Sequence, residues 1–255
     1  MFNFIRHWLD RRIIKNSTIS EAAWQQAILL LPLLHGLSDG ELQRLKELSI
    51  LFINAKEFEG ARGLKLNQAM ILLVAIQACL PILNLGLDKY KKWYTIIIYP
   101  ETFVTKRSIT DEYGIVSHEE SHLLGEAWHR GPVILAWNET ETAGVIDGHN
   151  LVIHEFAHKL DMQNDVANGF PPLNFGMKRK HWVNAFTKGF EDFQKKCHKS
   201  ELYGISCYGA TSPAEFFSVL SEVFFEKPGV IYKHYPDIYK QLSLYYRQSP
   251  IDRLP

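Results

Sequence analysis

Five consecutive residues, His154-Glu155-Phe156-Ala157-His158, constrain this chain more than any other feature of its sequence. In an α-helix, residues four apart lie on the same face, one turn above the other. Two neutral imidazoles placed in this way can bind a Zn²⁺ ion, and Glu155 lies beside them, where it can accept a proton from the metal-bound water. We therefore predict a helix over residues 148–162 that carries the catalytic element of a zinc peptidase.

The same pattern occurs a second time, at residues 118–122. Three apolar residues precede the 154 copy, and only uncharged residues separate its glutamate from its second histidine, as in a buried helix with one polar face. The 118 copy contains the additional charge of Glu120 and has short apolar flanks, so it predicts no helix with a buried face. We assign the catalytic role to the 154 copy, although Lys159 places a charge where zinc-peptidase helices usually carry none.

Length, charge and cysteine content narrow the class of protein. A chain of 255 residues, 46% of them hydrophobic, can build one large core, with or without a helical lobe. Its formal net charge is zero at pH 7, so we expect no direct binding of nucleic acid. The odd number and wide spacing of Cys79, Cys197 and Cys207, with no secretory signal, predict reduced thiols in a cytoplasmic protein.

Residues 1–15 mix apolar and basic side chains without the continuous apolar core of a secretory signal. They predict a helix docked on the protein itself or, alternatively, an amphipathic helix in contact with a membrane surface. The apolar run that begins at Ala69 ends at Pro81 and is too short to cross a bilayer. We therefore expect no transmembrane segment.

The order of the predicted elements indicates an α+β fold. Ser38 and Glu41 have the spacing of a capping box at the start of a helix. Periodicity and breakers predict helices over 20–31, 38–52, 67–82, 148–162, 178–197 and 213–225. Runs of β-branched and aromatic residues predict strands over 93–99, 103–105 and 132–137. We expect a helical N-terminal region (1–90), followed by a catalytic region (91–255) with a small mixed sheet, a zincin-type active-site helix and a helical C-terminal part, both regions forming one compact unit.

A catalytic zinc ion needs three protein ligands and one open position for water. Three histidines follow the active-site helix in the sequence: His181, His198 and His234. A histidine at the metzincin spacing would fall at Asn164, which excludes that class. Glu215 and Glu222 lie in an otherwise apolar stretch, where an acid is costly to bury unless it is paired or metal-bound. Glu215, in the first turn of its helix, is the preferred third ligand, and Glu222 would lie behind the ligands or on the surface.

Several segments resemble the MtfA (Mlc titration factor A) family of zinc peptidases, in register from about residue 20 to residue 255. They are residues 80–86, 98–100, 131–137, 154–161 and 212–222. The resemblance implies an aminopeptidase whose catalytic core is similar to that of anthrax lethal factor. It implies one zinc ion held by His154, His158 and Glu215, with Glu155 as the general base. It also implies that Tyr208, seven residues before the ligand glutamate, donates a hydrogen bond to the transition state.

These predictions describe a metallopeptidase in which Glu155 activates a zinc-bound water to hydrolyse a peptide substrate. The resembled family is named for sequestering a transcriptional repressor, so the alternative function is a regulatory protein that binds such a repressor, with an exposed Trp8 or Trp24 as its surface. A structural zinc site is disfavoured because such sites are usually closed by four ligands rich in cysteine.

Three smaller alternatives stay open at the level of sequence. Asp161 could orient an imidazole or cap the end of the active-site helix. Residues 132–137 could form an edge strand that aligns a peptide by main-chain pairing, or an interior strand. Cys207 could approach the metal ion or be a packed thiol.

Overall fold

The computed structural model describes residues 2–101, 104–110, 116–122, 131–142, 145–199 and 204–254, with the backbone alone for 2–4, 104–110 and 116–122. Within these ranges the fold is α+β, as the sequence predicts. The helices of the N-terminal region are α1 (Phe2–Lys15), α2 (Glu21–Leu29), η1 (Pro32–Leu34), α3 (Asp39–Ala55), α4 (Gln68–Cys79) and η2 (Leu87–Tyr90). The strands are β1 (Glu57–Gly60), β2 (Thr95–Tyr99), β3 (Val104–Thr110), β4 (Val116–His122) and β5 (Val133–Ala136).

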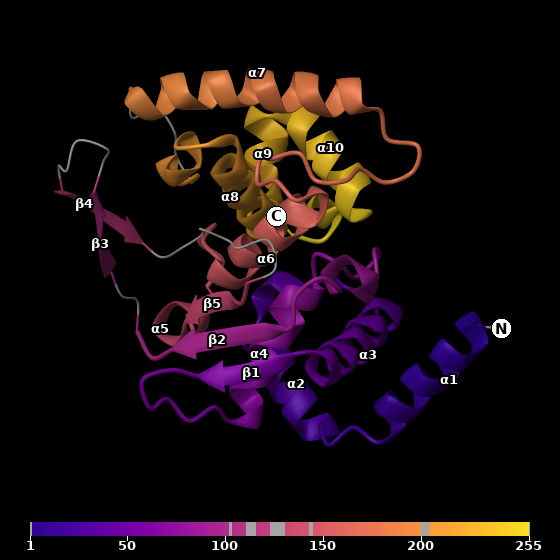
Figure 1. Ribbon diagram of the computed structural model, residues 1–255. Helices are drawn as coiled ribbons and strands as arrows, with labels where there is room; N and C mark the ends of the chain where they lie inside the picture. The colour runs from indigo at the N-terminus through magenta and orange to yellow at the C-terminus, as the bar shows by residue number, and fades with distance from the viewer. Residues whose placement is uncertain are drawn as a thin grey trace.

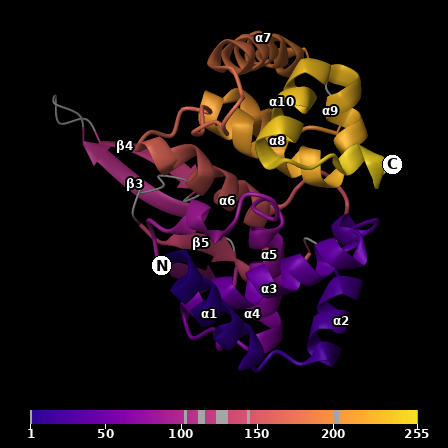
Figure 2. The same cartoon turned by 90° about the vertical axis from the view of Figure 1, so that its right-hand side faces the viewer.

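The remaining helices belong to the C-terminal part of the chain. They are α5 (Trp137–Thr140), α6 (Leu151–Asp161), η3 (Met162–Asn164), α7 (Arg179–His198), η4 (Cys207–Ala210), α8 (Pro213–Glu226), α9 (Pro228–His234), α10 (Pro236–Tyr246) and η5 (Pro250–Asp252). Figures 1 and 2 show α6 in the middle of the molecule, with α7 to α10 on one side and the sheet and α2 to α4 on the other. Helix α6, which carries the His154 motif, is therefore enclosed by both halves of the chain.

Local sequence signals set the helix starts. The predicted capping box is confirmed at α3, where the backbone N–H of Ser38 donates to Glu41 Oε2 at 2.9 Å and the Glu41 N–H donates to Ser38 Oγ. Asn67 caps α4 in the same way, because its side chain accepts from the Met70 N–H. These bonds satisfy N–H groups that have no partner within their helix.

The strands fall into two separate sheets rather than one mixed sheet. In the first, β1, β2 and β5 are parallel, in that order, so β5 is an edge strand of the sheet among the described residues. In the second, β3 and β4 pair antiparallel, with Val104 opposite His122. Figure 1 shows this hairpin projecting from the side of the molecule.

The second histidine motif lies in strand β4. A strand separates the Cα atoms of residues four apart by about 13 Å, whereas one turn of helix brings them together. The i, i+4 spacing of His118 and His122 therefore cannot form the helical pair that the motif requires. This agrees with the assignment of the catalytic role to the 154 copy.

One hydrophobic cluster includes residues from both the N-terminal and the C-terminal halves. Phe156 of α6 lies at its centre, with ring centroids 5.6 Å from Phe52, 5.1 Å from Tyr90 and 5.4 Å from Trp93. Trp24 belongs to the same cluster and is only 3% exposed, so the prediction that it forms an exposed binding surface is wrong. The buried Trp24 side chain packs α2 against the hydrophobic cluster. The boundary predicted at residue 90 stays a prediction.

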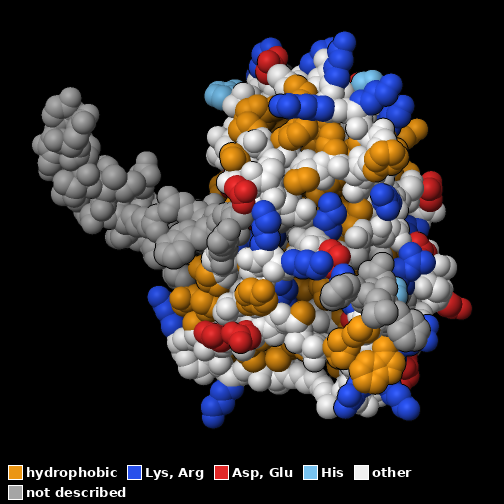
Figure 3. Space-filling view, turned by 45° about the vertical axis from the view of Figure 1, so that its right-hand side comes forward, with side chains coloured by type: hydrophobic (Ala, Val, Ile, Leu, Met, Phe, Trp, Pro, Cys, Tyr) orange, Lys and Arg blue, Asp and Glu red, His pale blue; other side chains and the backbone are white. Residues whose placement is uncertain are grey.

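Helix α1 is the most exposed of the N-terminal helices. Ile5, Trp8 and Leu9 are each about half exposed, and Arg6 forms an ion pair with Asp88 at the start of η2. Among the described residues, no helix combines the length and apolar character needed to span a bilayer. On the face shown in Figure 3, acidic and basic side chains are interspersed, in keeping with the zero net charge. Contact of residues 1–15 with a membrane surface stays a prediction.

A loop of residues 165–178 ties α6, α7 and α8 together through Gly169. The Gly169 N–H donates to Asp161 Oδ2 at 2.7 Å, and its carbonyl accepts from the Trp182 indole N–H at 3.1 Å. Gly169 has φ +70°, and a Cβ atom there would lie 2.3 Å from the Pro213 carbonyl oxygen. Only glycine fits this point, at which the end of α6 meets the start of α8.

The substitution Gly169→Ala should therefore lower the free energy of unfolding by about 2–4 kcal/mol, because left-handed strain and the collision with Pro213 add together. Gly176→Ala is the matched control, since Gly176 also has positive φ but no atom within 4 Å of the added methyl group. It should cost only about 1 kcal/mol. Urea denaturation measures both, and equal losses would show that the close approach to Pro213 has no energetic weight.

Candidate metal centre

Helix α6 presents its polar side chains from a buried position. Asn150 caps its first turn, accepting a hydrogen bond from the Ile153 N–H at 2.9 Å. Val152, Ile153 and Phe156 are fully buried on the apolar side. His154, Glu155 and His158 are also buried. Interactions with neighbouring groups must therefore offset the hydration that these side chains lose.

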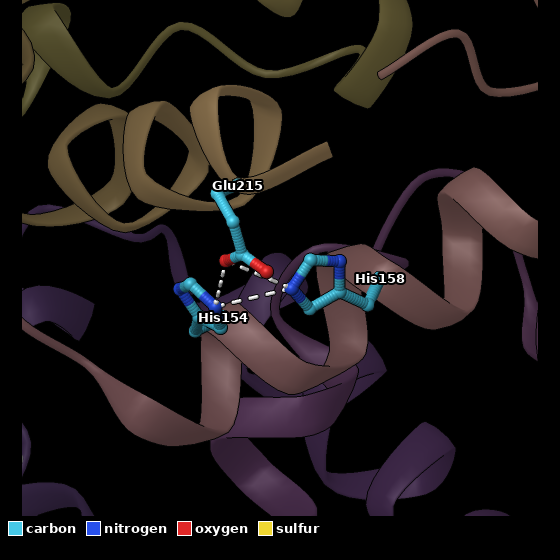
Figure 4. Close-up of side chains that lie close together, drawn as sticks. All are labelled: His154, His158 and Glu215. Atoms are coloured by element: carbon cyan, nitrogen blue, oxygen red, sulfur yellow. Dashed lines mark hydrogen bonds and ion pairs between the residues drawn. The ribbon is translucent and has the colours of Figure 1, made fainter. Parts of the chain in front are cut away.

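Helix α8 brings the third side chain. Pro213 occupies its first turn, and Ser212 caps it by accepting from the Glu215 N–H at 3.2 Å. Glu215 thus lies in the first turn, as predicted, and points across to α6 (Figure 4). The start of α8 is held against the end of α6 by Gly169.

Three donor atoms meet between the two helices. His154 Nε2 lies 3.1 Å from His158 Nε2 and 3.0 Å from Glu215 Oε2, and His158 Nε2 lies 3.2 Å from that oxygen (Figure 4). Ligands of a tetrahedral zinc ion with bonds of about 2.05 Å would be about 3.3 Å apart, so the triangle has the size that zinc requires. Among the described residues, this is the group of His, Cys, Asp or Glu side chains whose atoms converge in this way. The other histidines considered, His181, His198 and His234, are not part of it.

Glu222 fixes the orientation of His154. Its Oε1 lies 2.7 Å from His154 Nδ1, and its Oε2 accepts from the Asn150 backbone N–H at 2.6 Å. With the Nδ1 proton donated to this carboxylate, the Nε2 lone pair is directed at the triangle. Glu222 is 5% exposed and contacts His154 from the side away from the triangle, so it does not lie on the surface.

A second buried carboxylate continues this arrangement one turn later in α8. Glu226 accepts from the Gly148 N–H at 2.9 Å and from the Asn150 side-chain amide at 3.0 Å. The same amide donates to Gln77 Oε1 at 2.9 Å, and Gln77 is a buried polar residue of the otherwise apolar α4. Sequence reasoning missed Glu226 and Gln77, although an amide among the apolar residues of α4 was a visible signal.

Hydrogen bonds between the members of the triangle shift the pKa values of His154 and Glu215. Burial opposes a charge on His154, but hydrogen bonds to Glu215 and Glu222 outweigh it and raise the pKa of His154 to about 10. Burial likewise opposes the charge on Glu215, but the hydrogen bonds from His154 and His158 prevail and lower its pKa to about 2. Three electron-pair donor atoms that bind a proton this strongly can also bind a metal cation at the same position.

Glu155 lies beside the triangle with an unused oxygen. The residue is 6% exposed, and its Oε1 has no hydrogen-bond partner among the described residues. Burial raises the pKa of Glu155 above its usual value, and the neighbouring His154 and His158 act in the opposite direction. A buried carboxylate oxygen without a partner is costly, and such groups concentrate at functional sites.

Tyr208 of η4 lies on the open side of the triangle. Its ring centroid is 6.1 Å from that of His154, and its side chain is 37% exposed. Burial first, and then the charges of Glu215 and Glu155, raise the pKa of Tyr208 to about 12. The hydroxyl is therefore protonated at neutral pH and can donate a hydrogen bond to an anion.

The two charged residues near the end of α6 have structural partners. The Asp161 carboxylate accepts from the N–H groups of Asn168 and Gly169, so it holds the loop rather than an imidazole or the end of its own helix. Burial raises the pKa of Asp161 to about 6. Lys159 donates to the Gly131 carbonyl at 2.9 Å, which ties α6 to the chain just before β5.

The prediction of three reduced thiols is wrong for two of the cysteines. Cys197, in the last turn of α7, forms a disulfide with Cys207, the first residue of η4. Cys79 is the free thiol and is buried in α4. The spacing of ten residues gave no signal for this pairing, because it depends on where the ends of α7 and η4 meet. Neither alternative proposed for Cys207 holds, since its sulfur is bonded to Cys197.

A cavity of about 260 Å³ opens next to the donor triangle. His154 and Tyr208 line it on the side of the triangle, and Asn150 and Leu151 line it at the start of α6. Its other polar walls include Glu139, Thr142, Asp147, His149, Ser206 and Glu222. The described lining therefore carries carboxylates and no lysine or arginine, which favours a positively charged occupant.

Known proteins resemble this chain over nearly its whole length. A family model described as glucose-regulated metallo-peptidase M90 matches residues 5–247. Mlc titration factor A of Cronobacter sakazakii is 34% identical over 244 residues, which cover 93% of this chain and 90% of that protein. Mlc titration factor A of Salmonella typhi is 35% identical over 250 residues, covering 97% of this chain and 92% of the relative. The match includes α6 and α8, which carry the donor triangle.

Glu226 makes stability depend on pH. Burial raises its pKa from 4.5 to about 8, against the hydrogen bonds from Asn150 and Gly148. Between these values the folded protein keeps a proton that the unfolded chain has lost, so the free energy of unfolding falls as the pH rises. Glu226→Gln cannot ionise and should remove this fall, gaining on the order of a few kcal/mol relative to wild type between pH 5 and pH 8. Urea denaturation at both pH values tests this, and a difference independent of pH would contradict it.

Proposed function

Because the chain belongs to the glucose-regulated metallo-peptidase M90 family, and hence to the metallopeptidases, we propose that it hydrolyses peptide bonds with a zinc ion held by His154, His158 and Glu215. This membership confirms the resemblance found in the sequence. The observation that carries the proposal is the triangle of three donor atoms 3.0–3.2 Å apart, with the unpartnered oxygen of Glu155 beside it. Two imidazoles and one carboxylate are a ligand set of catalytic zinc sites.

A zinc ion held there would lower the pKa of a water molecule to about 7 and polarise the peptide carbonyl. Glu155 is the general base: its Oε1 accepts a proton from the attacking water. Its raised pKa suits this role, because a base is most effective when its pKa lies near the working pH. After attack, Glu155 gives the proton to the nitrogen of the leaving amine.

Tyr208 stabilises the negative charge that develops on the substrate oxygen. It lies on the exposed side of the triangle, beside the cavity, and keeps its proton at neutral pH. A hydrogen bond that forms only with the transition state raises kcat rather than substrate affinity. Glu222 supports the same chemistry by keeping His154 in the ligand orientation.

We propose further that the enzyme is an aminopeptidase, as the resemblance implies. Removal of a first residue requires recognition of a free α-ammonium group close to the scissile bond. The acidic cavity next to His154 supplies carboxylates at this position, and Asp147 is one of them. Strand β5 precedes α6 and packs against it, and the edge of β5 that has no partner strand among the described residues can pair with the backbone of an extended peptide.

Glu155→Gln should retain the metal ion and lower kcat by about 10²–10⁴-fold, because it removes the proton acceptor and none of the ligands. His154→Ala should lose the metal ion, whereas His118→Ala should keep it. Metal content by plasma mass spectrometry, together with peptide hydrolysis, measures both effects. Undiminished turnover by Glu155→Gln would remove Glu155 from the mechanism.

The same variant tests a second function. The relatives are named Mlc titration factor A, and we propose as the alternative that this chain also binds a transcriptional repressor. Glu155→Gln used as bait should capture such a partner intact and in stoichiometric amount. A regulator that acts by binding alone should be retained equally by wild type and by Glu155→Gln, whereas a substrate should be cleaved by wild type.

The aminopeptidase assignment predicts a dependence on the α-amine. Acetylation of the substrate N-terminus should lower kcat/KM by about 10–100-fold, the value of a hydrogen bond to a charged group. Asp147→Asn should cause a similar loss for the free-amine substrate and little change for the acetylated one. Hydrolysis of matched peptides measures all four combinations, and equal rates for free and acetylated peptides would favour an endopeptidase.

A further inference from the structure

The disulfide between Cys197 and Cys207 lies directly before Tyr208 in the chain. Cys197 belongs to the last turn of α7, and Cys207 begins η4. Cys207 is exposed and Cys197 is partly buried, so the bond can be reached from solvent on the Cys207 side. The reaction proposed above does not use this bond.

The far end of η4 is held firmly without the disulfide. Gly209 is packed so closely that a Cβ atom there would lie 3.3 Å from Val219 Cβ and 3.4 Å from Phe193 Cε1. The Ala210 carbonyl accepts from the Gln194 side-chain amide at 3.1 Å. These contacts fix the backbone after Tyr208 and join it to α7 and α8.

The near end of η4 depends on other contacts. Ser206 Oγ accepts from the Tyr208 N–H at 3.3 Å, which is a bond within the turn itself. The disulfide is the covalent connection between this end and α7. Tyr208, which is partly exposed, therefore lies in the chain between a tightly packed glycine and a disulfide-bonded cysteine.

We propose that the Cys197–Cys207 disulfide positions Tyr208 against the metal centre, so that its reduction lowers the catalytic rate. This rests on the proposed function, in which the Tyr208 hydroxyl meets the developing charge. A misplacement of a catalytic group by about 1 Å can cost 10²-fold in rate, so a modest loosening of η4 is sufficient. Cys197 and Cys207 are positioning residues that act through Tyr208.

The reductant would be a dithiol. One of its thiolates attacks the exposed Cys207 sulfur, and the S–S bond breaks with its electron pair on the Cys197 sulfur, which takes a proton. The second thiol of the reductant then attacks the mixed disulfide and releases Cys207 as a thiol. Two electrons and two protons pass to the protein, and the reductant becomes a disulfide. Oxidation reverses the same steps.

The test compares Cys197→Ser, which cannot form the bond, with wild type in two backgrounds. In the wild-type background kcat should fall about 3–30-fold, with KM and metal content unchanged. In the Tyr208→Phe background, which should itself have a lower kcat, Cys197→Ser should cause no further loss. Cys79→Ala is the control, because it removes a thiol that forms no disulfide. An equal loss in both backgrounds, or no loss in either, would overturn the proposal.

Hydrogen exchange gives a readout that does not depend on catalysis. Treatment of the zinc-loaded wild-type protein with dithiothreitol should speed amide exchange in the peptide covering residues 204–211 by about tenfold, with mass spectrometry confirming two new thiols. Unchanged exchange after complete reduction would overturn the proposal even if the protein is a peptidase. If exchange speeds up but neither wild type nor Tyr208→Phe hydrolyses peptides, the proposed function fails while the positioning of η4 stands.

Discussion

The hydrogen bonds of the Glu222 carboxylate are the interactions on which the candidate metal centre depends. One oxygen takes the Nδ1 proton of His154, and the other takes the backbone N–H of Asn150, the cap of α6. A single buried side chain therefore contacts both His154 and the start of the helix that carries it. Since Glu215 comes from the same helix two turns earlier, α8 supplies one member of the donor triangle and orients another. The triangle is assembled by the packing of α6 against α8.

The rest of the fold serves to hold these two helices in register. At the start of α6, Asn150 connects Glu226 of α8 with Gln77 of α4, so the N-terminal helices are joined to the metal centre by buried hydrogen bonds. At the other end, Gly169 lies between Asp161 and Pro213, where no side chain fits. Phe156 anchors the apolar side of α6 in the aromatic cluster. Buried polar groups are costly when unpaired. The hydrogen bonds of Asn150 and Asp161 therefore restrict the site to one arrangement.

The open side of the site is built differently. Tyr208 lies near the surface and lines the acidic cavity. It belongs to η4, a short helix that a disulfide connects to α7. The donor triangle is buried, whereas Tyr208, whose hydroxyl we propose to meet the substrate, lies between a closely packed glycine and a disulfide-bonded cysteine. The donor triangle thus lies in the buried interior, and the group that we propose to meet the substrate lies where a substrate can enter.

The sequence by itself determined several of the elements and the residues that form the donor triangle. Its i, i+4 histidines identified α6, the acid in the first turn of a Pro-started helix identified Glu215, and the capping box located α3, because each depends on residues close in the chain. Tyr208 came only through resemblance to a family. The tertiary structure decided that Glu222 faces His154, that Asp161 holds a loop, that Trp24 is buried, and that Cys197 pairs with Cys207. It also placed the second histidine motif in strand β4, where residues four apart cannot form the helical histidine pair that binds one metal ion. These outcomes depend on which surfaces meet across long stretches of chain, and local periodicity carries no information about that.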